Sequence, residues 1–468
     1  MKSYNLRFKI IFLSIIFLGI FGLVKSSWAA DYFVATFGNN SNQGTQLQPW
    51  RTIGKAASTL KSGDTVYVQE GTYPEVVTVG ASGSAGNPIT YRANGIVNVQ
   101  RWAVSSKNYV TIDGFHSVTG YAPGGDQFLV SIYGTSSYVT VQNMTLTISN
   151  PTTVAPCINE GGLIQTTKTT SHITVMGNTL SRSCYYPAVQ TAGDHQTYSN
   201  NTIFDILTDA FQGEGLSNST ISGNAIGPFI ILGYHNDCYQ LFSVAANTPN
   251  NEITIENNIC HDGDQPGNMS LDGQSSSGIY IRNNIFYNFT GQFGLGIPNT
   301  KVYNNVFFRT ATVTNFTALG TTGWGTTITG IEVKNNFFIG IGVPTYNYDY
   351  GTGYTVTATN AGASNNFYAR DPAWTNPWGV VPFAIGPNEP NMVNGGNPLF
   401  TDYATHNFTL QTTSPARDTG ITISSFAVDK NKVSRPQGSA WDIGAYEYFS
   451  GAPIDTTPPA NPTGLSVV

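Results

Sequence analysis

The chain has 468 residues, of which only 10% are charged, and its formal net charge is −6. This balance excludes the basic surface that a nucleic-acid partner would need. The 50 glycines and the low charge favour short strands and tight turns over long helices.

The first thirty residues differ from the rest of the chain. Lys2, Arg7 and Lys9 precede an apolar run over residues 10–24, and small residues follow it. This pattern predicts a signal peptide over residues 1–30 and a secreted or cell-surface protein, with an uncleaved membrane anchor as the alternative. Cleavage removes four basic and no acidic residues, which leaves 17 basic against 27 acidic residues. No later stretch is apolar enough to cross a membrane.

A short helix is predicted soon after the leader. Apolar side chains fall on one helical face at Ile53, Ala56, Ala57 and Leu60. A turn at residues 62–64 and a strand at residues 65–69 then follow. Such a helix can cover the open end of a stacked structure.

A repeat occupies the middle of the chain. Each copy alternates β-branched and polar residues, and most end in Asn followed by an apolar residue, as in "VTVQNMTL", "ITVMGNTL", "ITIENNI" and "IEVKNNFF". The shorter steps between copies are a little over twenty residues. We take the following asparagines as equivalent positions of the repeat: Asn143, Asn178, Asn201, Asn224, Asn258, Asn284, Asn305, Asn336 and Asn366.

A unit of this size cannot bury its apolar face alone. Stacked copies give each strand a parallel partner and enclose one continuous core. The equivalent asparagines are then expected at a bend, where their amides bond to one another from rung to rung.

The last part of the chain closes this unit. The segments "FTLQTTSPARDTG" and "DIGAYEY" are predicted to seal the final rungs of a single domain over residues 31–449. Residues 450–468 are rich in proline, which is typical of an extended linker. Their end, "PTGLSVV", resembles the first strand of a fibronectin type III module, so further C-terminal modules are an open expectation.

With this repeat and these ends, residues 31–449 resemble a right-handed parallel β-helix of the pectate lyase-like type. The resemblance implies an all-β, single-stranded solenoid of about ten rungs with a short N-terminal capping helix. It also implies that functional residues gather on the outward side of neighbouring rungs.

Aligning the rungs places candidate residues side by side. Asp209 and Asp237 come one residue before equivalent strand triplets, which stacks them about 5 Å apart, the spacing of neighbouring strands. Two such carboxylates are expected to share a proton, to bind a cation or to accept hydrogen bonds from nearby donor groups. They can also simply accept backbone N–H groups at the start of the strands.

Other residues complete the predicted site. His235 and Arg282 join the two aspartates as candidate catalytic residues. Glu214, Asp262 and Asp264 are candidate calcium ligands with Asp209 and Asp237, although a turn role for Asp262 and Asp264 is the alternative. The predicted sugar contacts are the stacked Gln190, Gln212 and Gln240, with Gln165 in the same column, and Tyr239; the glutamines can alternatively bond only to one another.

Two enzyme families with this fold offer comparisons. "YHNDCYQLF", residues 234–242, resembles the calcium-binding run of polysaccharide lyase family nine, which carries over only Asp237, with Asp209 as a companion. The run that holds the catalytic lysine in that family is "GNMSLDG" here and contains no lysine. Thr208-Asp209 and Asn236-Asp237 resemble parts of the polygalacturonase motifs, whose other two motifs have no counterpart.

Four cysteines permit two disulfides in a secreted chain. Cys184 lies about one rung after Cys157, and Cys260 about one rung after Cys238. The rung spacing suits the pairs 157–184 and 238–260.

The sequence therefore predicts a secreted, monomeric, carbohydrate-active protein. The leading expectation is lyase-type cleavage of an acidic polysaccharide assisted by calcium. The alternatives are a non-catalytic glycan-binding surface protein and a polygalacturonase-like hydrolase.

Overall fold

The structure, a computed structural model, describes residues 29–119, 128–148, 161–183, 186–230, 236–242, 248–264, 267–269, 276–289, 293–309, 330–340, 362–370 and 389–451. The predicted signal peptide up to residue 28 and the predicted linker from residue 452 lie outside these residues.

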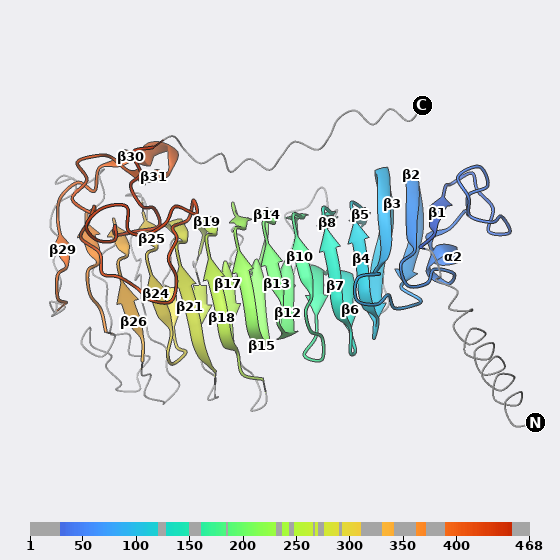
Figure 1. Ribbon diagram of the computed structural model, residues 1–468, viewed down its shortest axis with the longest axis horizontal. Coiled ribbons are helices and arrows are strands. Elements are labelled where there is room, and N and C mark those ends of the chain that lie inside the picture. Colours follow the sequence, from blue (N-terminus) through green and yellow to red (C-terminus); the bar gives the residue numbers. More distant parts are fainter. Residues whose placement is uncertain are drawn as a thin grey trace, which may run out of the picture.

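The strands form three parallel sheets that wind around one core (Figure 1). Sheet 1 contains β6 (Phe128–Tyr133), β9 (Gly162–Thr166), β12 (Val189–Asp194), the start of β15 (Phe211–Ser222), β17 (Tyr239–Leu241), β20 (Gly267–Met269) and β23 (Phe293–Leu295).

Sheet 2 is the sheet seen from the front in Figure 1. It contains β1 (Asp31–Val34), the starts of β2 (Thr65–Thr78) and β3 (Ile89–Ser105), β4 (Asn108–Asp113), β7 (Ser137–Gln142), β10 (Thr174–Met176), β13 (Thr197–Ser199), the end of β15, β18 (Asn251–Glu256), β21 (Ser277–Arg282), β24 (Lys301–Tyr303) and β26 (Glu332–Lys334).

Sheet 3 completes each rung. Its strands are β5 (His116–Thr119), β8 (Thr145–Ile148), β11 (Thr179–Ser181), β14 (Thr202–Phe204), β16 (Ala225–Ile226), β19 (Ile259–Gly263), β22 (Ile285–Phe289), β25 (Val306–Phe308), β27 (Phe337–Ile339), β28 (Phe367–Ala369) and β29 (Val393–Asn394). The chain visits sheets 1, 2 and 3 in turn, so the domain is a parallel β-helix, as the repeat predicts.

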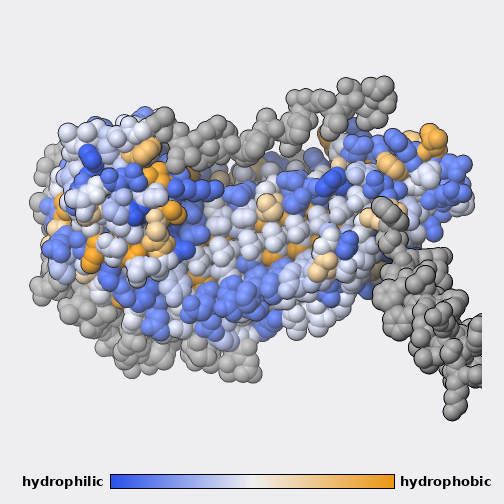
Figure 2. Space-filling model, viewed as in Figure 1, coloured by the Kyte–Doolittle hydropathy of each residue, from blue (hydrophilic) through white to orange (hydrophobic). Residues whose placement is uncertain are grey.

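The alternation of period two decides which side chains enter the core. On sheet 2 the inward column is apolar and fully buried from rung to rung: Val66, Tyr91, Ile112, Val141, Val175, Tyr198, Ile221, Ile255, Ile281, Val302 and Val333. Over eight successive rungs, one outward column of the same sheet consists of threonines: Thr65, Thr90, Thr111, Thr140, Thr174, Thr197, Thr220 and Thr254. In Figure 2 the central rungs of this front face are pale, which reflects their weakly polar side chains.

The predicted helix at the N-terminal end is confirmed. α2 spans Ile53–Ala57, and the Thr52 side chain caps it by accepting a hydrogen bond from the Lys55 N–H. Its buried residues pack beside β1 and β2 at the end of the solenoid, and the predicted strand begins at Thr65. The helix therefore covers the first rung.

The bend between sheets 2 and 3 explains the paired asparagines. The first residue of each pair adopts a left-handed conformation, with φ of 59° at Asn257 and 54° at Asn304, which only Asn or Gly adopts readily. The second points inward, and the amides bond in series; Asn224 Nδ2, for example, donates to Asn258 Oδ1 at 2.9 Å. The amide ladder runs through Asn178, Asn201, Asn224, Asn258, Asn284, Asn305, Asn336 and Asn366.

Asn143 was assigned wrongly to this ladder. Thr179 pairs with Thr145, so Met144 is level with Asn178, and Asn143 is the left-handed residue before it, with φ of 54°. The Met144 N–H donates to Asn178 Oδ1 at 2.9 Å. The sequence alignment was displaced by one residue there, because either residue of the turn can be Asn.

The C-terminal segment, residues 398–449, is here called the strap; it contains β30 (Phe400–Asp402), the 3-10 helix η1 (Tyr403–Thr405) and β31 (Asn407–Leu410). The strap lies along the outside of the last rungs (Figure 1). It forms a second apolar core with outward residues of sheet 3, including Val306, Phe337 and Phe367. The left-handed asparagines hold its backbone: Asn304 Nδ2 donates to the carbonyl of Asp442 at 3.0 Å, and Asn365 Nδ2 donates to that of Thr419 at 2.9 Å.

Candidate functional site

The two aspartates lie where the strands of sheet 1 begin. The Ala210 N–H donates to the Asp237 carbonyl, and Phe211 pairs with Tyr239, so Asp209 and Asp237 occupy neighbouring rungs, as expected. Asp209 Oδ1 accepts the Asp237 N–H at 3.1 Å. Asp209 is 5% exposed and Asp237 is fully buried. The pair therefore lies beneath the surface, and Asp209 organises the backbone of the next rung.

The prediction for Tyr239 is wrong. Its side chain is fully buried in the core, where its ring lies 5.9 Å from that of Phe211. Burial raises the pKa of Tyr239 well above 10. Strand alternation directs Tyr239 inward because its neighbour Gln240 points outward, so Tyr239 cannot contact a bound sugar.

Arg282 does not join the aspartates. It ends β21 in sheet 2, where its Nε lies 2.7 Å from Glu256 Oε2 and its Nη1 donates to the Ser425 carbonyl of the strap at 3.2 Å. The guanidinium also lies 5.0 Å from the ring of Phe426. Arg282 thus binds the strap to the solenoid. His235, the other predicted catalytic residue, lies outside the described residues.

The structure also separates the predicted cation ligands. Glu214 lies at the bend between sheets 1 and 2, where its Oε1 accepts from Thr248 at 3.0 Å and lies 3.7 Å from Lys168 Nζ. Asp262 belongs to β19 in sheet 3, where it accepts from Asn288. Asp264 follows β19 by one residue.

Within the described part of the chain, no three His, Cys, Asp or Glu residues gather closely enough to hold a metal ion. Two buried carboxylates alone do not fit a hard cation that takes six to eight oxygen ligands. Calcium binding therefore remains a prediction from the sequence.

The predicted column of glutamines is present on the outward face of sheet 1. Gln165, Gln190, Gln212 and Gln240 pair in register on four successive strands, and each is half-buried. Gln165 Nε2 donates to Gln190 Oε1 at 2.7 Å, and Gln212 Nε2 donates to Gln240 Oε1 at 2.8 Å. The column, here called the glutamine ladder, presents amide groups at the strand spacing of about 4.8 Å.

One of the two predicted disulfides is confirmed. Cys238 and Cys260 are joined, with their Cα atoms 6.4 Å apart, and both are fully buried. The bond links the start of a sheet 1 strand to sheet 3 of the same rung. Cys157 and Cys184 lie outside the described residues.

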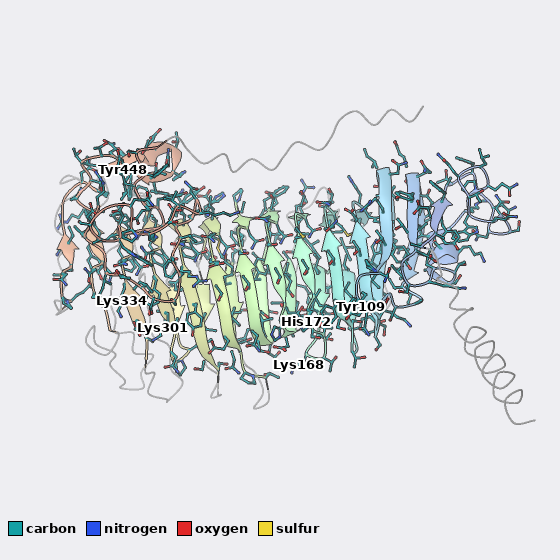
Figure 3. The ribbon with its side chains drawn as sticks, in the orientation of Figure 1. Tyr109, Lys168, His172, Lys301, Lys334 and Tyr448 are labelled. Atoms are coloured by element: carbon teal, nitrogen blue, oxygen red, sulfur yellow. A yellow bond between two sulfur atoms is a disulfide. The ribbon has the colours of Figure 1, made fainter. Side chains whose placement is uncertain are left out.

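A stack of four rings was missed by the sequence analysis. Tyr109, Tyr138, His172 and His195 occupy successive rungs at the edge of sheet 2, with ring centroids 4.5 to 4.8 Å apart. Figure 3 shows Tyr109 and His172 along the same margin of the front sheet, with Lys168 nearby. Each ring comes two residues before a threonine of the outward column, and this spacing could have revealed it. The rings cover one another's faces, so mainly their edges remain for contact.

A charged cluster occupies sheet 2 near the C-terminal end of the solenoid (Figure 3). Lys301 and Lys334 both contact Glu332, and Tyr303 donates to Glu332 at 2.8 Å. Burial alone would raise the pKa of Glu332, but hydrogen bonds from both lysines and from Tyr303 outweigh it and lower this pKa to about 2.

The low pKa of Glu332 predicts a pH dependence of stability. Because the pKa in the folded state lies below the ordinary value of 4.5, the stabilisation is present above about pH 4.5 and is lost as the pH falls towards 2. We expect Glu332→Gln to lower the denaturant midpoint at pH 7 and to lower it by a much smaller amount at pH 2.5. Parallel denaturation series of the two proteins would measure this, and an equal difference at both pH values would contradict it.

No helix among the described residues has the length and apolar character needed to span a membrane.

Comparisons of the sequence with known proteins match short segments of the chain. Residues 36–78 match a family described as "Protein of unknown function (DUF1565)". A segment of 86 residues, 18% of this chain and 18% of the relative, is 37% identical to the Bacillus subtilis (strain 168) protein described as "Uncharacterized protein YwoF". The matched segment thus spans less than a fifth of that protein.

Solved structures extend the similarity to most of the chain. The complex of XylC with xylose covers 90% of this chain and 98% of its own, with a TM-score of 0.53 and 14% identity. Pectate lyase Pel9A covers 90% and 97%, with a TM-score of 0.46 and 14% identity. At such identities the likeness concerns the fold alone. The chain is, in its fold, a parallel β-helix, and over most of its length this fold is similar to that of XylC.

Proposed function

We propose that this chain is a secreted polysaccharide-binding protein whose glycan lies along the glutamine ladder of sheet 1. The observation that carries the proposal is the outward, half-buried column of Gln165, Gln190, Gln212 and Gln240. A side-chain amide both donates to and accepts from sugar hydroxyls. The solved complex of XylC, a protein of similar fold, contains xylose, which supports a carbohydrate partner.

The other outward faces favour this choice of sheet. On the last rungs, the outside of sheet 3 is covered by the strap, and Arg282 at the edge of sheet 2 contacts the strap as well. The ring stack at the margin of sheet 2 offers few free ring faces for sugars. The ladder is thus a regularly spaced polar column on an outward face that the strap does not cover.

The test is a binding measurement with a matched pair of double variants. Gln190→Ala with Gln212→Ala removes the centre of the ladder, whereas Thr197→Ala with Thr220→Ala alters sheet 2 on the same two rungs. Affinity electrophoresis against soluble polysaccharides should show at least tenfold weaker binding for the glutamine variant only. Equal retardation of both variants and the unaltered protein would contradict the proposal.

Cleavage of an acidic polysaccharide is the second candidate. The observation that favours it is the Asp209–Asp237 pair beside the ladder, where Asp209 Oδ2 lies 3.3 Å from Gln212 Nε2. Neighbouring carboxylates ionise together only at a cost, so one of them can retain a proton and act as an acid.

Products distinguish the reaction classes. Unsaturated sugar ends would show a lyase, and new reducing ends without unsaturation would show a hydrolase of the polygalacturonase kind. Activity that is lost in chelator and restored by calcium would support the calcium prediction. Unchanged activity in Asp237→Ala would remove the aspartate pair from the site, provided that its unfolding curve matches that of the unaltered protein.

A further inference from the structure

The glutamine ladder is interrupted at its centre. Gln190 and Gln212 are register partners on β12 and β15, yet no hydrogen bond joins their side chains among the described contacts. Gln190 Oε1 accepts from Gln165, which leaves the Gln190 amide N–H groups available. Gln212 Nε2 donates to both Asp209 and Gln240, which leaves the Gln212 carbonyl oxygen available.

Asp209 determines the orientation of the Gln212 side-chain amide. Its carboxylate accepts from Gln212 Nε2 at 3.3 Å, while its other oxygen is held by the Asp237 N–H at 3.1 Å. An amide group whose nitrogen is bonded on both sides must present its oxygen elsewhere. The remaining donor of Gln190 and the remaining acceptor of Gln212 therefore belong to register partners on neighbouring strands, whose backbones are about 4.8 Å apart.

The ladder also lacks positive charge. Its residues are uncharged amides, and Lys168 at the nearby bend contacts the carboxylate of Glu214 at 3.7 Å. The whole chain carries a net charge of −6. A uronate chain would be repelled by this field and would find no described cation in the ladder to compensate.

We propose that the polysaccharide is neutral and that one sugar hydroxyl bridges Gln190 and Gln212. The inference rests on the proposed function and names the substrate class of the same site. A hydroxyl accepts from Gln190 Nε2 and donates to Gln212 Oε1, so it completes the ladder. A carboxylate only accepts, so it would be repelled by the Gln212 oxygen. Asp209 is a positioning residue in this arrangement, since it acts through Gln212.

Calorimetric titration with two probes of equal length tests the inference: a xylo-oligosaccharide, which is neutral, and an oligogalacturonide, which is acidic. Each is titrated in chelator and again in calcium. We expect the neutral probe to bind at least tenfold more tightly in both solutions and with little change between low and high salt.

Variants at the gap locate the contact. Gln190→Leu and Gln212→Leu should each weaken the neutral probe about tenfold, as expected for one lost hydrogen bond with an unpaired partner. Thr197→Val on the same rung of sheet 2 is the control and should not change affinity. Asp209→Asn should weaken binding although Gln190 and Gln212 are both unaltered. The new side-chain amide can donate as well as accept, so it no longer fixes the orientation of the Gln212 amide.

The outcomes separate the two proposals. Tighter binding of the oligogalacturonide, with or without calcium, overturns the neutral class and leaves the ladder as the binding face. Neutral binding that both leucine variants retain overturns the hydroxyl bridge. A protein that binds neither probe nor any polysaccharide of the panel overturns the proposed function itself.

Discussion

Replacing Asn258 with alanine is expected to lower the free energy of unfolding by about 4 kcal/mol, since each orphaned buried polar group costs about 1 to 3 kcal/mol. The Asn258 amide donates to the Ile221 carbonyl and to Asn284 Oδ1, and its oxygen accepts the backbone and side-chain N–H groups of Asn224. All of these groups lie inside the bend, where water cannot replace the lost partner. Chemical denaturation followed by circular dichroism measures the change.

The matched control is Asn200→Gly on an earlier rung. Asn200 is the exposed left-handed residue of its pair, with φ of 54°, a conformation that glycine adopts without strain. We expect a change below about 1 kcal/mol for this variant. A loss for Asn258→Ala no greater than that of the control would show that the amide ladder does not stabilise the solenoid.

The second large effect is expected in the strap. Arg435 and Glu447 form an ion pair at 2.7 Å, and both side chains are fully buried. Arg435 also donates to the carbonyls of Asp442 and Gly444. We expect Arg435→Met to destabilise the strap by about 3 to 5 kcal/mol, because the carboxylate then remains buried without its partner. The fluorescence of Trp441, whose ring lies 5.5 Å from the guanidinium, reports the local unfolding.

The sign of the pH effect follows from the neighbouring carboxyls. Burial raises the pKa values of Asp429, Asp442 and Glu447, although the Arg435 charge opposes the shift at each. A carboxyl with a raised pKa in the folded state makes the fold more stable as the pH falls through that value. Loss of the arginine raises these pKa values further, so the defect of Arg435→Met should be smaller at pH 5 than at pH 8.

A double variant isolates the cause. Arg435→Met with Glu447→Leu removes both charges and should recover much of the lost stability, since an apolar pair of similar volume can replace a buried ion pair. If the double variant is less stable than Arg435→Met alone, the packing of these side chains, rather than an unpaired charge, dominates.

The distribution of paired asparagines shows how far the docking site of the strap could have been predicted from the sequence. In the early rungs the left-handed position holds Gly177, Asn200 or Gly223, all exposed. In the last rungs it is always Asn, and Asn304 and Asn365 use their side chains to bind the strap. The doublet by itself predicts only the ladder, because nothing local to a rung shows that a distant segment docks there.

The sequence by itself was enough to predict the contacts between neighbouring rungs, along the axis of the solenoid. The inward apolar column, the inward asparagines, the glutamine column and the Asp209–Asp237 neighbours all follow from residues one rung apart. Such contacts repeat along one axis at a fixed strand spacing, so aligning the repeats is enough to find them.

Only the tertiary structure decided what happens around the circumference of each rung. It placed Tyr239 inward, Arg282 on a different sheet from the aspartates and the predicted cation ligands on three separate parts of the rung. It also showed that the Gln212 amide donates to Asp209, and that the ladder has no described hydrogen bond between Gln190 and Gln212. These features depend on loop lengths, on the bend at which a strand changes sheet and on a strap more than a hundred residues away, and none of them has a periodic signal in the chain.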